Sequence, residues 1–155
     1  MKTYKFKLKL TKKQENTCKS WINSCRSLYN LALNERIMVY EMRKKSVSKY
    51  DQYNQLPELK KLYPWLGEVY SDTIQEVLDR LDKTYQNFFR GTGFPKFSKK
   101  GEYNSFTFKR SFKVNEKTIK LPKIGEVKYF NSRDIVGTLK TATIIKEDNS
   151  WFICI

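Results

Sequence analysis

The sequence predicts an α+β fold: a small β-barrel with a helical lobe inserted between its first and second strands. Three observations predict this fold. Apolar residues alternate with lysines over Tyr4–Leu10, recur at spacings of three and four through the middle of the chain, and alternate again in short segments toward the C-terminus. The first strand would lack partners unless it joined the later ones. We therefore assign residues 1–10 and 92–155 to the barrel and residues 11–91 to the helical lobe.

The N-terminal strand has one apolar face and one basic face. Its basic face consists of Lys5, Lys7 and Lys9. Lysines in such positions can contact phosphate groups, and they can equally face solvent and protect a strand edge from aggregation. The residues alone leave both readings open.

A long helix is expected to follow this strand. Thr11 and Gln14 fit a capping box, in which the two side chains satisfy backbone groups reciprocally. The apolar stripe that follows continues to Tyr40. The helix should end near Arg43, because basic residues suit the negative end of its dipole.

A connection, a short helix and a second long helix complete the lobe. Residues 47–54 are predicted as a polar connection. Pro57 is expected in the first turn of a short helix over Glu58–Leu62. Ser71 is expected to cap the second long helix, with Asp72 near its positive end.

Six short strands are predicted in the C-terminal third, where turn residues separate alternating segments. They are Ser105–Lys109, Phe112–Val114, Thr118–Leu121, Glu126–Phe130, Leu139–Lys146 and Ser150–Ile155. Strands at such close intervals are typical of a small barrel or a sandwich.

The positive charge of the chain indicates a polyanionic partner. There are 31 Lys+Arg against 16 Asp+Glu, a formal net charge of +15. Residues 11–91 hold 14 basic and 10 acidic residues, which leaves 17 basic and 6 acidic residues for the rest. DNA or RNA is the most frequent partner of such a surface, which we expect mainly on the β part.

Several other classes of function have no support in the sequence. No apolar run is long enough to span a bilayer, and the N-terminus lacks the apolar segment of a signal peptide, so we expect a cytoplasmic protein without a membrane partner. The chain has no histidine, and its three cysteines have no CxxC spacing. Buried, reduced thiols are therefore expected rather than metal ligands. No catalytic residue, cofactor site or small-molecule site is predicted.

The stretch Gly93–Arg110 combines basic and aromatic residues. Its basic residues are Lys96, Lys99, Lys100, Lys109 and Arg110, and it also holds four phenylalanines and one tyrosine. Such a mixture suits a nucleic-acid backbone and its bases. The alternative is a solvated basic loop whose aromatic residues belong to the core.

Four blocks of the sequence together resemble the N-terminal half of TnpB, also called OrfB, the family of transposon-encoded RNA-guided DNA endonucleases. They are Cys25-Arg-Ser-Leu-Tyr-Asn-Leu-Ala-Leu33, Tyr63-Pro-Trp-Leu-Gly-Glu-Val69 with its continuation through Gln75 to Arg90, Gly93-Phe-Pro-Lys-Phe97, and Lys120-Leu-Pro-Lys-Ile-Gly125. Their order and spacing extend over nearly all of the chain.

The resemblance implies a wedge barrel split by a helical recognition lobe, the two parts that hold a guide RNA and read a short transposon-adjacent motif in double-stranded target DNA. Pairing with the guide then reads most of the target sequence. Cleavage in this family belongs to a RuvC-like domain that binds divalent metal, which we expect to be magnesium. We expect that domain beyond Ile155, so this chain should be a binding module without nuclease activity or cofactor.

The resemblance also assigns residues. It places the motif-reading surface at Tyr50, Asn54, Ser71, Asp72, Gln75 and Thr107, and it favours phosphate contacts for the basic residues of Gly93–Arg110. Structural alternatives exist, because Tyr50 can simply pack and Ser71 can serve as a helix cap. Asp72 departs from expectation, since an acid there would repel phosphate.

A second reading stays open on these residues. The chain could instead be a stand-alone DNA-binding protein of the helix-turn-helix type, from a transposon or a regulatory system, that reads duplex DNA without guide RNA. RNA that copurifies with the protein would separate the two readings.

Overall fold

The computed structural model describes residues 3–155, so Met1 and Lys2, the first two residues of the segment 1–10 assigned to the barrel, lie outside the described residues. The chain forms two compact units. One unit contains the N-terminal residues up to Ile22 together with Asn104–Ile155, and the other contains Asn23–Tyr103. We call them the sheet unit and the helical unit.

Seven strands of the sheet unit form one antiparallel sheet in the order β2-β6-β7-β1-β5-β4-β3. They are β1 (Lys5–Lys9), β2 (Ser105–Phe108), β3 (Lys113–Val114), β4 (Thr118–Leu121), β5 (Gly125–Tyr129), β6 (Ala142–Glu147) and β7 (Ser150–Cys154). The N-terminal strand lies in the middle of the order. It pairs with β7 through Lys5–Lys7 and with β5 through Leu8 and Lys9, so the expectation that it joins the later strands is confirmed.

The predicted closure into a barrel is not observed. The sheet ends at β2 on one side and at β3 on the other, and these two strands do not pair with each other among residues 3–155. Closing a sheet requires two edge strands long enough to share a ladder. Here β3 has 2 residues and β2 has 4, which leaves little backbone for such a ladder.

Alternation of side chains produces the core of the sheet unit. The burial of β1 follows the sequence pattern, with Phe6 and Leu8 buried and the lysines exposed. Trp21, near the start of the long helix α1 (Lys12–Arg43), packs against Phe106 and Phe108 of β2 with ring centroids 5.4 and 5.9 Å apart. Each such aromatic side chain contributes about 1.5–3 kcal/mol through burial.

The start of α1 follows the predicted capping box. The Gln14 amide donates to Thr11 Oγ1, and the Thr11 amide donates to Gln14 Oε1, both at 3.1 Å. Cys18 and Cys25 are free thiols on the buried face of this helix, as predicted. Burial raises the pKa of each thiol to about 12.

The second helix differs from the prediction. It is α2 (Lys49–Leu62), so residues 49–54 are helical rather than a connection, and Pro57 lies inside the helix rather than in its first turn. The physical reason is a second capping box, because the Ser48 side chain accepts from the Asp51 amide while Asp51 accepts from the Ser48 amide. Two reciprocal bonds nucleate the helix upstream, and the φ of Pro57 is compatible with its continuation.

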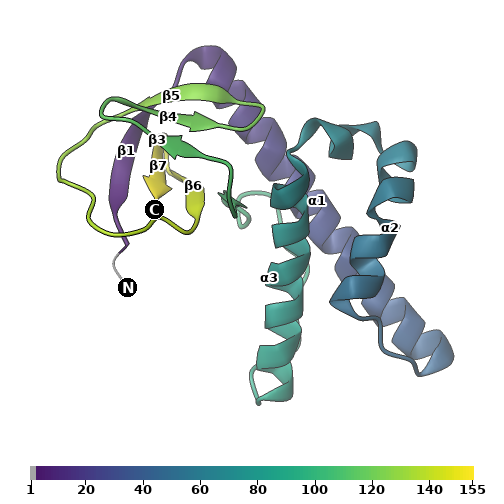
Figure 1. Ribbon diagram of the computed structural model, residues 1–155. Coiled ribbons are helices and arrows are strands. Elements are labelled where there is room, and N and C mark those ends of the chain that lie inside the picture. The colour runs from purple at the N-terminus through teal and green to yellow at the C-terminus, as the bar shows by residue number, and fades with distance from the viewer. Residues whose placement is uncertain (1–2) are drawn as a thin grey trace. The chain divides into compact units, whose positions relative to one another are not determined.

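The third long segment is α3 (Ser71–Phe89), which the short 3-10 helix η1 (Pro64–Glu68) connects to α2. Figure 1 shows α2 and α3 running in opposite directions on either side of this connection. The prediction that Ser71 caps α3 is wrong. Tyr70 occupies the N-cap position without a side-chain hydrogen bond, and Ser71 Oγ instead accepts from Lys60 Nζ of α2 at 3.1 Å.

Candidate nucleic-acid interface

A hydrogen-bonded clamp holds the loop that carries the predicted phosphate-binding lysines. Asn30 of α1 donates from Nδ2 to the Ser98 carbonyl oxygen at 2.9 Å, and its Oδ1 accepts from the Ser98 amide at 2.8 Å. One side chain therefore satisfies both backbone groups of one loop residue, as a strand neighbour would. A loop of otherwise irregular backbone is thereby held in place against a helix.

The lysines of this loop face solvent on either side of the clamp. Lys96, Lys99 and Lys100 are all exposed. Beyond them, the ring of Tyr103 packs against Tyr29 at 5.8 Å and lies 5.3 Å from the Arg80 guanidinium. Because the loop is already held in place, its three exposed lysines can contact a phosphate backbone without the entropic cost of ordering the loop.

A second basic surface covers the exposed side of the sheet, and we call it the lysine face. It consists of Lys7 and Lys9 of β1, Lys128 of β5, Lys120 of β4 and Lys113 of β3. The strand register sets Lys9 directly opposite Lys128 and Lys113 directly opposite Lys120. On its other side, Lys120 is directly opposite Glu126 of β5. In the part of the chain that the structure describes, none of the five has a carboxylate within ion-pair distance.

The lysine face is electrostatically unfavourable for the isolated protein. Like charges directly opposite on neighbouring strands destabilise a sheet, and two such pairs occur here, against one opposite-charge pair of Lys120 and Glu126. A bound polyanion would remove this repulsion and release its own counterions. Lys7 and Lys9 are among the predicted phosphate contacts, whereas Lys113, Lys120 and Lys128 are not, although lysine alternates with apolar residues in β4 and β5 and this pattern is a usable signal.

The remaining residues that are predicted to contact the nucleic-acid backbone interact with other groups of the protein. Lys5 Nζ forms an ion pair with Glu147 at 2.6 Å and lies 4.6 Å from the centre of the Phe152 ring. Lys109 is half-buried and Arg110 is exposed just after β2, and both take part in interactions within the chain. These three are therefore less available to phosphate than the lysine face.

Five of the six predicted motif-reading residues lie on the antiparallel helices α2 and α3. Tyr50 is 67% exposed and Asn54 is exposed one turn further along α2. Ser71, Asp72 and Gln75 occupy the first two turns of α3. The bond from Lys60 to Ser71 joins the end of α2 to the start of α3.

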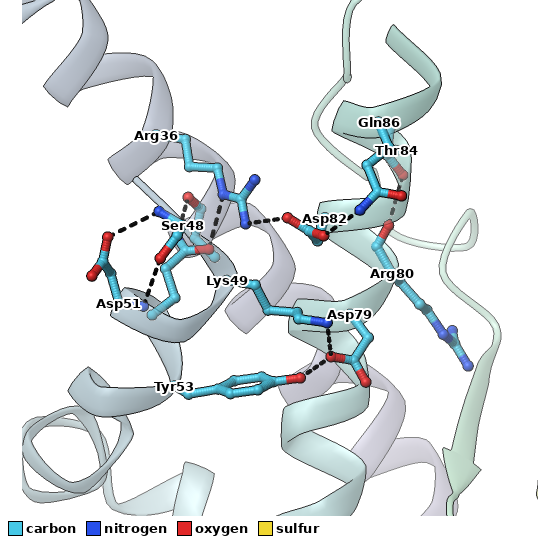
Figure 2. A network of polar contacts seen from close by, with 12 residues as sticks. Arg36, Ser48, Lys49, Asp51, Tyr53, Asp79, Arg80, Asp82, Thr84 and Gln86 are labelled. Atoms are coloured by element: carbon cyan, nitrogen blue, oxygen red, sulfur yellow. Dashed lines mark hydrogen bonds and ion pairs between the residues drawn. The ribbon is translucent and has the colours of Figure 1, made fainter. Parts of the chain in front are cut away.

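Contacts between α2 and α3 show where along the helix pair each predicted residue lies. The start of α2 meets α3 at Asp79, which Lys49 Nζ approaches to 3.7 Å and to which the Tyr53 hydroxyl donates (Figure 2). Burial and the Asp79 carboxylate raise the pKa of Tyr53. Along the helix pair, Tyr50 therefore lies beside Asp79, whereas Gln75 lies between the Asp79 contact and the Lys60–Ser71 contact.

Thr107 lies on β2 in the sheet unit. It is 9% exposed, and its Oγ1 is 2.8 Å from Oγ1 of Thr143, the residue directly opposite on β6. Thr107 is therefore a member of a cross-strand hydroxyl pair, with little surface for a base edge.

A polar network fixes the helical unit. Arg36 of α1 donates from Nε to Gln52 Oε1 at 3.0 Å and from Nη2 to Asp82 Oδ1 at 3.3 Å, so it connects all three helices (Figure 2). Gln52 also donates to the Ala32 carbonyl oxygen at 2.9 Å. Arg36 is 7% exposed, and its burial is tolerable only because these partners are present.

Neither a cluster of metal-ligand side chains nor a membrane-spanning helix occurs among the described residues. Within residues 3–155 there is no group of three His, Cys, Asp or Glu side chains that could hold a metal ion. None of the helices in the same range combines the length and the apolar character that crossing a bilayer requires.

Comparison with known proteins agrees with the sequence blocks. A family model described as a helix-turn-helix domain, HTH_OrfB_IS605, matches residues 1–45. Over 160 aligned residues the whole chain is 30% identical to InsQ of Escherichia coli (strain K12), which is named as an RNA-guided DNA endonuclease. Both comparisons point to the OrfB (TnpB) family that the sequence blocks resemble. The chain spans 40% of the length of the E. coli relative.

The OrfB helix-turn-helix match covers β1 and α1. Among residues 3–45 the structure has one continuous helix, and the next helix, α2, begins at Lys49. The turn between the two helices therefore lies just beyond the matched range.

Proposed function

We propose that this chain is the guide-RNA-binding and target-DNA-binding part of an OrfB-type RNA-guided nuclease. In this proposal the lysine face and the loop lysines Lys96, Lys99 and Lys100 contact phosphates. The surface of α2 and α3 around Tyr50, Asn54 and Gln75 reads a short motif in the DNA. The lysine face carries the proposal, because it holds two directly opposed lysine pairs, and these favour a polyanion over solvent even though Lys120 also has Glu126 directly opposite on β5.

The name of the similar E. coli protein supports the choice of guide RNA and DNA as partners. We propose further that this segment binds without cutting. Strand cleavage and its divalent metal, magnesium, would then belong to the part of OrfB proteins that this chain does not span.

Charge neutralisation tests the phosphate contacts. In one variant Lys9→Gln is combined with Lys128→Gln, and in another the three loop lysines are changed to glutamine. Each lost phosphate contact should reduce the slope of log affinity against log salt by about 0.9 for duplex DNA and about 0.7 for single strands. A matched control combines Lys61→Gln with Lys83→Gln, two exposed lysines of the helices. Slopes equal to the control would contradict the proposed phosphate surface.

The description of the family model favours a second candidate, a helix-turn-helix protein that reads duplex DNA unaided. Analysis of the purified protein for bound RNA distinguishes the two. A defined RNA that copurifies and is required for DNA binding supports the guide-dependent function. Sequence-specific duplex binding by RNA-free protein would establish the second candidate instead.

A further inference from the structure

A cavity of about 600 Å³ opens within the helical unit, where the last turns of α1 and α3 meet the loop that begins at Gly91. Its walls include Tyr40 of α1, Tyr85, Phe88 and Phe89 of α3, and Phe94 of the loop. This volume lies in the range of pockets that hold small ligands. None of the predicted site residues lines it.

The aromatic walls of this cavity are not a closed core. Tyr40 is 56% exposed, Phe89 is 76% exposed and Phe94 is 49% exposed. Phe94 meets Tyr85 and Phe88 edge to face, with ring centroids 6.1 and 5.1 Å apart. The rings thus support one another in fixed orientations while leaving faces uncovered, which is the arrangement that base stacking uses.

Cations stand at the rim of the cavity where α1 ends. Lys44 and Lys45 line it, and Lys44 Nζ lies 5.2 Å from the centre of the Tyr40 ring. Lys44 has a φ of 54°, in the left-handed region that glycine usually occupies after a helix. A non-glycine residue there carries strain, and strain of this kind often accompanies a binding role. In this conformation the Lys44 ammonium group lies beside the aromatic wall of the cavity.

The acidic side chains of the cavity are partly engaged. Asp82 accepts from Arg36 Nη2 and, at 2.9 Å, from Gln86 Nε2 (Figure 2). The Arg36 guanidinium also lies 4.9 Å from the centre of the Tyr85 ring. Glu41 lines the cavity as well, so two lysines face one acid outside the Arg36–Asp82 pair. The charge at the rim is therefore positive and complements a phosphate.

We propose that this cavity binds an unpaired nucleotide of a nucleic-acid strand, with the base stacked on the exposed aromatic rings and its phosphate beside Lys44 and Lys45. This inference rests on the proposed nucleic-acid-binding function and adds a site to it. Stacking of a base explains why the aromatic rings are exposed. The two lysines contact the phosphate, and an apolar ligand would not need them.

Binding of fluorescent single-stranded dodecamers tests the site, using RNA, DNA and a backbone of the same length without bases. Tyr40→Ala and Phe89→Ala should each weaken binding of base-containing strands by about five-fold to 150-fold, the usual range for the loss of one stacking ring. Tyr40→Trp and Phe89→Trp should restore it. Binding of the base-free strand should be equal in all variants. The control is Met42→Ala, a 75% exposed residue of α1 that does not line the cavity.

Each outcome of this experiment decides something. A stronger effect on RNA or on DNA supports the site and identifies its source strand. Unchanged affinity in both alanine variants, with tight and salt-dependent binding retained, overturns the site alone. An equal loss on the base-free strand also overturns it, because stacking needs a base. If the wild-type protein binds no strand at all, the site and the proposed function fall together.

Discussion

Asn30 and Ser98, 68 residues apart in the chain, are joined by two hydrogen bonds in opposite directions. The Asn30 side chain meets the Ser98 backbone as a second strand would. This contact holds the lysine-bearing loop against α1 at Ser98, between the aromatic contacts of Phe94 and Tyr103.

Replacing Asn30 by alanine should release this loop. Because the Ser98 amide and carbonyl would lose their partners, we expect a loss of about 1–3 kcal/mol in the free energy of unfolding. Hydrogen exchange at the Ser98 amide should accelerate, and affinity for nucleic acid should fall because the loop must be ordered on binding. The control Asn34→Ala removes an exposed asparagine one turn along the same helix. Equal exchange at Ser98 in both variants would contradict this role of Asn30.

Asp82→Ala should destabilise the helical unit strongly. It leaves the buried Arg36 guanidinium without its carboxylate, and breaking a buried ion pair in this way costs about 3–5 kcal/mol. Chemical denaturation measures the loss. The neighbouring exposed Lys83→Ala should stay within about 0.5 kcal/mol of wild type. If both variants unfold at the same denaturant concentration, Arg36 has an adequate partner elsewhere.

Pro57→Ala should stabilise the protein. Pro57 lies inside α2 and has no amide hydrogen to donate to the Tyr53 carbonyl oxygen. Alanine would restore this bond, and the gain should be about 1–3 kcal/mol, up to the full difference in helix propensity. Thermal and chemical unfolding would show it as a raised midpoint. A lowered midpoint would mean that the packing of α2 requires the bend that proline introduces.

The capping box of α2 should weaken in acid. Hydrogen bonds from Ser48 lower the pKa of Asp51 in the folded protein. A carboxyl group with a lowered folded pKa stabilises the protein above its unfolded value, near 3.8, and this contribution is lost as pH falls through the folded value. The unfolding free energy of wild type should therefore fall below about pH 4 more than that of Asp51→Asn. Parallel pH profiles of the two proteins would refute the role of the Asp51 charge.

Much of the local structure follows from the sequence because its signals are local. The Thr11–Gln14 box, the apolar stripe of α1 and the alternation in β4 and β5 each involve residues a few positions apart, and the structure contains each of them. The errors have local causes too. Proline at position 57 predicts a helix start, but the capping box at Ser48 begins the helix upstream.

The candidate site was predictable only in part. Alternation placed Lys7 and Lys9 on an exposed face, but the like-charged partners of the lysine face come from strands more than a hundred residues away. Their pairing depends on strand order and register, which no local pattern encodes. The same holds for the exposed aromatic cavity, which α1, α3 and the following loop form together.

By itself the sequence determined the α+β class, the positive charge, the Thr11–Gln14 capping box and the family blocks, because composition and short-range patterns carry these properties. The tertiary structure alone decided that β1 lies in the middle of an open sheet, that Lys9 meets Lys128, and that Asn30 holds Ser98. Each of these depends on contacts between distant segments. Forming such contacts lowers the entropy of the chain, and only the packing of the whole unit offsets this loss.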